Sequence, residues 1–163
     1  MTDSLGLKEF VQAHVDGMGA GWLAFLPAVI FLIAVLLAFA SGTSWGTFGM
    51  LIPIAIAVTQ NNPDLMYIAI SACMAGAVCG DHCSPISDTT IMSSAGAGVN
   101  HISHVETQLP YAMTVAAVSF FIYIVAGVTK SWVISLPVGI AVMIGVLFVI
   151  RSMTGGKRQP QKA

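Results

Sequence analysis

Long apolar runs separated by short polar segments are the dominant pattern of the chain. No Asp, Glu, Lys or Arg occurs in residues 17–63, 107–129 or 131–150. A helix needs about 20 apolar residues to cross a bilayer, so runs of this length predict several transmembrane helices. Two of the runs, residues 111–129 and 132–150, are uninterrupted and predict plain helices joined by a tight turn.

The first apolar run, residues 21–40, ends at the glycine-rich polar segment SGTSWGTFG, residues 41–49, and only residues 50–59 are apolar after it. At about 1.5 Å per residue, this second run covers about half of a ~30 Å hydrocarbon core. Irregular backbone inside a membrane survives only where protein or a water-filled cavity satisfies it. Residues 21–59 therefore predict a re-entrant hairpin with a polar tip. Two ordinary helices joined by a surface turn are the alternative.

The next unit, residues 65–100, consists of two apolar pieces on either side of GDHCSPISDTT, residues 80–90. Neither piece is long enough to cross a membrane, but together they are. This pattern predicts a discontinuous helix: a half-helix, an unwound polar stretch around Pro85, and a second half-helix rich in small residues. A polar surface loop is the alternative.

Composition supports a membrane protein and excludes a nucleic-acid partner. The 163 residues are 56% hydrophobic and only 8% charged, whereas soluble domains carry about 25% charged residues. A net charge of -1 leaves no basic surface for nucleic acid. Four of the six cations lie in residues 151–163, which predicts a cytoplasmic C-terminal tail and a multi-pass location in the cell (inner) membrane. Residues 1–20 mix charged and apolar positions and predict an amphipathic lead-in.

The two polar segments carry the candidate chemistry. Inserting a carboxylate such as Asp81 or Asp88 into a membrane costs about 2.5–3.5 kcal/mol, so both are expected to face a cavity or a partner. Hard cations prefer oxygen ligands. The broken helix offers Ser84, Thr89 and Thr90, and the hairpin tip offers Thr43, Ser44 and Thr47. A carboxylate that must release its proton to bind a cation makes the two ions compete. Competition coupled to alternating access is antiport.

Other kinds of site are weaker interpretations of the same residues. His82 can exchange protons near neutral pH, or it can simply bond a backbone carbonyl at the break. Cys79, Asp81, His82 and Cys83 are crowded for a transition-metal site, and no second ligand pair exists. Ser84 lacks the nucleophile elbow of a hydrolase, so an enzyme is not expected. The three cysteines lack paired spacing and are predicted to be free thiols. His101 and His104 are predicted to lie in a solvent-facing loop.

Three segments together resemble the NhaC-type sodium/proton antiporters, within a broader group of ion transporters. They are GTSWGTFG at 42–49, GDHCSPISDTTIMSS at 80–94 and GAGVNHISHVETQLPYA at 96–112. The resemblance implies gradient-driven cation exchange, with sodium and protons as the transported species and no cofactor. Some relatives also exchange organic acids such as malate and lactate. Carried over residue by residue, Asp81, His82, Ser84, Asp88, Thr89 and Thr90 match the long motif, and Thr43, Ser44 and Thr47 match the hairpin tip.

The resemblance covers only the C-terminal part of proteins that are several hundred residues long. Transporters built from hairpins and broken helices usually contain two such units related by inverted symmetry, and one unit is found here. The predicted fold is thus an all-α membrane protein that forms half of an inverted-repeat transporter. Its expected partners are the lipid bilayer and an N-terminal counterpart in the same or another chain. A homodimer is also compatible. A sodium- and proton-coupled organic-acid or amino-acid exchanger, or a non-transporting truncated subunit, are the alternatives to an antiporter.

Overall fold

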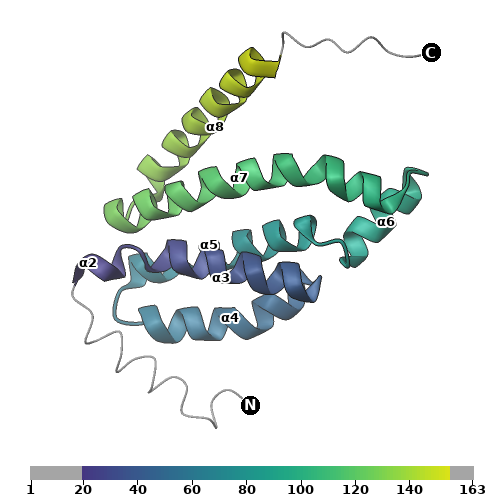
Figure 1. Ribbon diagram of the computed structural model, residues 1–163. Coiled ribbons are helices and arrows are strands. Elements are labelled where there is room, and N and C mark those ends of the chain that lie inside the picture. Colours follow the sequence, from purple (N-terminus) through teal and green to yellow (C-terminus); the bar gives the residue numbers. More distant parts are fainter. Residues whose placement is uncertain (1–19, 155–163) are drawn as a thin grey trace.

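The computed structural model describes residues 20–154, and every regular element in this part is an α-helix (Figure 1). The helices are α2 (Ala20–Leu23), α3 (Leu26–Ser41), α4 (Ser44–Thr59), α5 (Pro63–Cys83), α6 (Asp88–Gly96), α7 (His101–Thr129) and α8 (Trp132–Thr154). Three helical segments are long and apolar enough to cross a membrane: Pro63–Cys83, His101–Thr129 and Val133–Met153. The predicted all-α membrane fold is confirmed. The predicted lead-in, apart from residue 20, and the tail beyond residue 154 lie outside the described residues.

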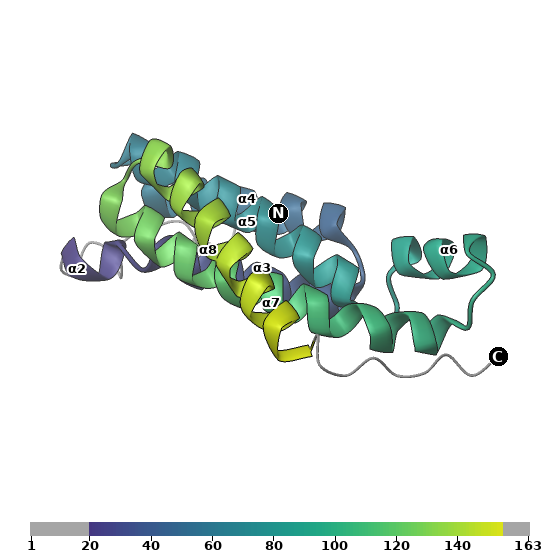
Figure 2. The same cartoon turned by 90° about the horizontal axis from the view of Figure 1, so that it is seen from above.

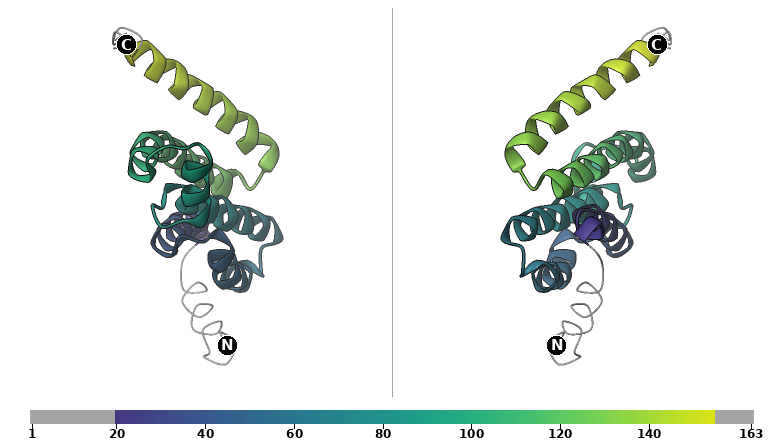
Figure 3. Two further views of the ribbon diagram at one scale, coloured as in Figure 1. Left: turned by 90° about the vertical axis from the view of Figure 1, so that its right-hand side faces the viewer. Right: turned by 90° about the vertical axis from the view of Figure 1, so that its left-hand side faces the viewer.

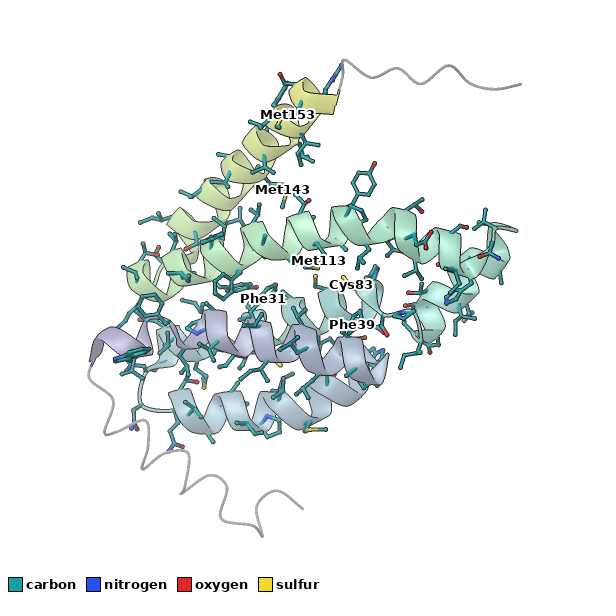
Figure 4. All side chains as sticks on the ribbon, in the orientation of Figure 1. Phe31, Phe39, Cys83, Met113, Met143 and Met153 are labelled. Carbon is teal, nitrogen blue, oxygen red and sulfur yellow. The ribbon has the colours of Figure 1, made fainter. Side chains whose placement is uncertain are left out.

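Helix α5 is the centre of the bundle and α8 is at its edge. Within their apolar windows, 39% of α5 is buried against the rest of the protein, compared with 17% for α7 and 6% for α8. Figures 1 and 3 show α8 leaning away from the other helices. Met153 near its end is 80% exposed and projects outward, while Phe31 lies between α3 and α7 (Figure 4). The Phe31 ring packs against Tyr123 of α7, with ring centroids 5.3 Å apart.

Helices α3 and α5 touch through small residues. Gly76 and Gly80 lie one turn apart on α5, and a Cβ added at either would overlap a carbonyl oxygen of α3, that of Phe31 or that of Val35. Ala34 and Ala38 of α3 are fully buried and pack against Ala77 of α5. Small side chains let helix backbones approach closely, which is how helices gain packing energy in lipid. This contact fixes the hairpin onto the broken helix.

The hairpin differs from the prediction in the length of its arms. Both α3 and α4 have 16 residues, and only Gly42 and Thr43 separate them. Residues 44–49, predicted as part of the polar tip, are helical because Thr43 caps α4: its Oγ1 accepts the Gly46 N–H at 3.4 Å. The short second arm at residues 50–59 was therefore a wrong prediction. Each arm covers about 24 Å, less than a ~30 Å core, and re-entrance stays a prediction.

The break in the second unit is shorter than predicted. Helix α5 continues through Cys83 and α6 begins at Asp88, so only residues 84–87 are unwound. Residues 80–83 of the polar motif are thus helical, contrary to the expectation. Helix α6 does not extend the axis of α5: it lies beside the first turns of α7 (Figures 1 and 2).

Helix α7 begins ten residues earlier than the predicted start at residue 111. The Asn100 side chain accepts hydrogen bonds from the backbone N–H groups of Ile102 and Ser103, at 3.0 and 3.3 Å. Such a cap satisfies donors that would otherwise be unpaired at the helix start. The loop predicted around His101 and His104 was therefore wrong. Both histidines lie in the first turns of α7.

The α3–α5 contact predicts that Gly80→Ala destabilises the protein by about 1–3 kcal/mol, the usual cost of overpacking a close contact. The free energy of unfolding in detergent micelles measures this. Gly49→Ala in α4 is the matched control, because nothing lies within 4 Å of its added Cβ. Equal stabilities of the two variants would contradict the proposed role of the contact.

Candidate functional site

The hairpin tip and the break in the second helix meet at one point. Gly42, at the end of α3, has a φ of 66°, a left-handed conformation that favours glycine. A Cβ added there would lie 2.9 Å from Cγ1 of Ile86 and 3.0 Å from its carbonyl oxygen. Gly42 therefore permits direct contact between the tip and the unwound stretch. The two polar segments of the sequence therefore lie side by side.

Asp81 is the buried carboxylate of this site. It is 4% exposed, and its Oδ1 is buried with no hydrogen-bond partner in the described structure. Asp81 follows Ala77 by one turn on α5, and Ala77 packs against α3 with Leu51 of α4 beside it. Residues four apart share a helix face, so Asp81 extends this contact towards the hairpin tip. An unpaired polar atom in a buried position is costly and points to a function.

Three hydroxyl-bearing candidates are buried, as Asp81 is. Thr47 of α4 is 3% exposed and lies one turn before Leu51, again on the tip side. Its Oγ1 donates to the Thr43 carbonyl at 2.9 Å, which leaves the oxygen lone pairs to accept. Ser84 is fully buried at the start of the break, and Thr90 of α6 is 3% exposed. Thr43 and Ser44 at the tip are half-buried.

The other candidates of the long motif lie on the surface of the described part. His82, Asp88 and Thr89 are exposed. His82 Nδ1 contacts the Val78 carbonyl at 3.1 Å, one turn earlier in α5 and not at the break where the alternative expected it. Asp88 begins α6, where its Oδ1 accepts the Thr89 N–H at 2.7 Å and its charge faces the positive end of the helix dipole. The structure therefore separates Asp88, as an exposed helix-start residue, from the buried Asp81.

Sequence reasoning missed the side chains of α7 that reach the break. Gln108 Nε2 donates to the His82 carbonyl at 3.0 Å, and His101 Nε2 contacts the Pro85 carbonyl at 2.7 Å. His101 and Gln108 are seven residues apart, which places them two turns apart on one helix face. The sequence would have indicated this shared face only if the helix had been known to begin at residue 101.

The cysteines and the possible metal ligands carry less of the argument than the carboxylates and hydroxyl groups. Cys73, Cys79 and Cys83 are free, and Cys83 is the last residue of α5, next to the break (Figure 4). Within residues 20–154, no three His, Cys, Asp or Glu side chains lie close enough to hold a metal ion.

A groove of about 920 Å³ runs between α5 and α7, and its mostly apolar wall includes His82 and Gln108.

Comparison with known proteins places these features in a family. Residues 1–128 match the Na+/H+ antiporter family. An uncharacterized protein of Haemophilus influenzae is 51% identical over 79% of this chain, which is 25% of that protein. The malate-2H(+)/Na(+)-lactate antiporter of Bacillus subtilis is 31% identical over 64% of the chain and 24% of its own length. The arginine/ornithine antiporter of Halobacterium salinarum is 34% identical over 64% of the chain and 23% of its own length.

No solved structure matches the chain. The chain spans about a quarter of the length of the curated relatives it matches. The family and the two relatives with named activities are antiporters, not enzymes. The match to the family covers the hairpin, the broken helix and nearly all of α7. The chain therefore belongs to the Na+/H+ antiporter family.

Proposed function

We propose that the chain forms part of a secondary active sodium/proton antiporter in which both ions compete for Asp81. The observation that carries the proposal is the buried carboxylate oxygen of Asp81, which has no partner where α5 meets the hairpin. Membership of the family supports cation/proton antiport in general. The assignment to Asp81 is the specific step of the proposal.

An ionised carboxylate in this position needs a positive partner. Between residues 20 and 154, the only Lys or Arg residues are Lys130, after the end of α7, and Arg151, in the last turn of α8. Neither lies on the elements that surround Asp81. A charge that no fixed cation neutralises is stabilised by a bound proton or a bound sodium ion. Because one carboxylate takes either ion, binding of sodium expels the proton.

The surrounding oxygens suit sodium as a substrate. Thr47 near the hairpin tip and Ser84 at the start of the break supply buried hydroxyl groups, and hard cations prefer oxygen ligands. We propose that Thr43, Ser44, Thr89 and Thr90 complete the site during the transport cycle. His82 uses Nδ1 for its bond to Val78, so only Nε2 is left to exchange a proton.

Asp88 is proposed as the second coupled carboxylate. It is exposed in a chain that spans a quarter of its relatives, and we propose that it faces the N-terminal counterpart of the transporter, in the same or another chain. Leu147, Phe148 and Val149 of α8 are each more than half exposed. We propose that lipid or another part of the transporter covers these apolar side chains. The inner membrane as location and a cytoplasmic C-terminus belong to the same proposal.

A second candidate is a sodium- and proton-coupled exchanger of organic acids or amino acids. Two relatives carry such names, one for malate and lactate and one for arginine and ornithine. The ion site would be shared, and the organic substrate would contact parts of the protein beyond this chain. Sodium flux in vesicles that rises when malate, lactate, arginine or ornithine is added would favour this candidate. Flux that needs only sodium and a pH gradient favours the simple antiporter.

Asp81→Asn, made in the transporter that contains this chain, tests the proposed ion site. Sodium-dependent proton flux should be lost, because an amide cannot exchange the proton. The fold should persist, since Oδ1 makes no hydrogen bond that the substitution would break. Flux is measured with a pH-sensitive dye in vesicles, and insertion by the amount of protein in the membrane. The control is Asp64→Asn, an exposed carboxylate in the first turn of the same helix, which should keep full flux.

Asp88→Asn tests the second carboxylate. The asparagine keeps an Oδ1 that can accept the Thr89 N–H, so the start of α6 is preserved and only the charge is removed. We expect sodium-dependent proton flux to fall at least about tenfold, the effect of losing about 1.4 kcal/mol. Glu106→Gln, an exposed carboxylate on α7, is the matched control and should transport normally. Normal flux in Asp88→Asn would mean that this aspartate only stabilises the start of α6.

A further inference from the structure

Two side chains of α7 hold carbonyl groups at the break. Gln108 Nε2 donates to the His82 carbonyl at 3.0 Å, and His101 Nε2 lies 2.7 Å from the Pro85 carbonyl. A carbonyl oxygen only accepts, so Nε2 of His101 must be the protonated, donating nitrogen. The two donors lie on one face of α7, and the two acceptors lie on either side of Ser84.

These carbonyls have no partner in the backbone of the break itself. The last carbonyls of a helix lack intrahelical donors, and the backbone N–H groups of the break pair with other carbonyls. The Ser84 N–H bonds the Asp81 carbonyl at 3.0 Å, and the Ser87 N–H bonds the Ser84 carbonyl at 3.4 Å. The carbonyls of His82 and Pro85 are paired by side chains of α7.

The orientation of His101 is itself fixed. Its Nδ1 lies 3.1 Å from Oγ of Ser94 on α6, and its backbone follows the Asn100 cap of α7. Ser94 is 2% exposed, so this contact is buried. A ring held at both nitrogens has a single orientation. His101 thus ties together α6, α7 and the break.

We infer that His101 and Gln108 are positioning residues for cation binding: they hold the break against the hairpin tip so that Asp81 and Ser84 keep their buried geometry. The expected effect on sodium transport rests on the proposed function. The expected effect on the structure of the break does not. The His82 carbonyl at the end of α5 and the Pro85 carbonyl in the break each already contact a side chain of α7, which favours side-chain oxygens as the sodium ligands. The affinity for sodium then depends on α7, which itself does not touch the ion.

The chain offers a matched comparison for the kinetic test. His104 also lies on α7 and also pairs with an α6 serine, with Nε2 3.2 Å from Oγ of Ser93, but it makes no bond to the break. Gln108→Ala and His101→Ala should each raise the KM for sodium about three- to tenfold, the size expected for one lost hydrogen bond, with a smaller change in kcat. His104→Ala should leave the KM unchanged. His101→Gln, which keeps an N–H donor, should restore most of the loss.

A second measurement does not depend on transport. Cys83 ends α5 beside the break, whereas Cys73 is fully buried ten residues earlier in the same helix. In single-cysteine variants of the complete transporter, His101→Ala or Gln108→Ala should speed maleimide labelling of Cys83 and leave that of Cys73 unchanged. Faster labelling of both cysteines would mean general loosening of the bundle and would overturn the inference. So would equal KM effects of His101→Ala and His104→Ala.

The two measurements also separate this inference from the proposed function. If Asp81→Asn keeps full flux while Cys83 labelling responds selectively to the α7 substitutions, the proposed ion site is wrong and the hold of α7 on the break stands. If Asp81→Asn abolishes flux and Cys83 labelling does not respond, the ion site stands and the positioning role is wrong.

Discussion

The close approach of α3 and α5 is the contact on which the site depends. Gly76 and Gly80 let the backbone of α5 lie directly on carbonyl groups of α3. In lipid there is no hydrophobic force between helices, so packing of this kind supplies the attraction. Asp81 lies one turn after Ala77, which packs against α3, so the same contact helps to bury the carboxylate. It also sets α3 at the height where Gly42 meets Ile86.

Three parts of the fold contribute to the candidate site. The hairpin closes one side of Asp81, the break supplies Ser84, and α7 holds the break through His101 and Gln108. The carbonyls of His82 and Pro85 have hydrogen-bond partners on α7. Irregular backbone inside a membrane needs such partners, because lipid offers none. The unpaired Oδ1 of Asp81 is the exception, and it is the observation on which the proposed ion site rests.

The sequence predicted the helices well where they are apolar and poorly where they are polar. Residues 44–49 and 101–110 were expected to be irregular because of their hydroxyl, glycine and histidine side chains, and both are helical. Thr43 and Asn100 cap these helices, and Thr47 and Thr107 donate to backbone carbonyls one turn earlier. Polar residues that bond their own helix do not end it, and hydropathy cannot distinguish these residues from those of a loop.

The sequence alone determined that the chain is an all-α membrane protein, that its polar segments fall in two places, and that Asp81 and Asp88 are the acids of the second segment. These properties follow from composition and spacing, which are local. Only the tertiary structure decided that Asp81 is buried and unpaired while Asp88 is exposed. It also decided that Gln108 reaches His82 and His101 reaches Pro85, because these partners are 26 and 16 residues apart and helix packing alone brings them together.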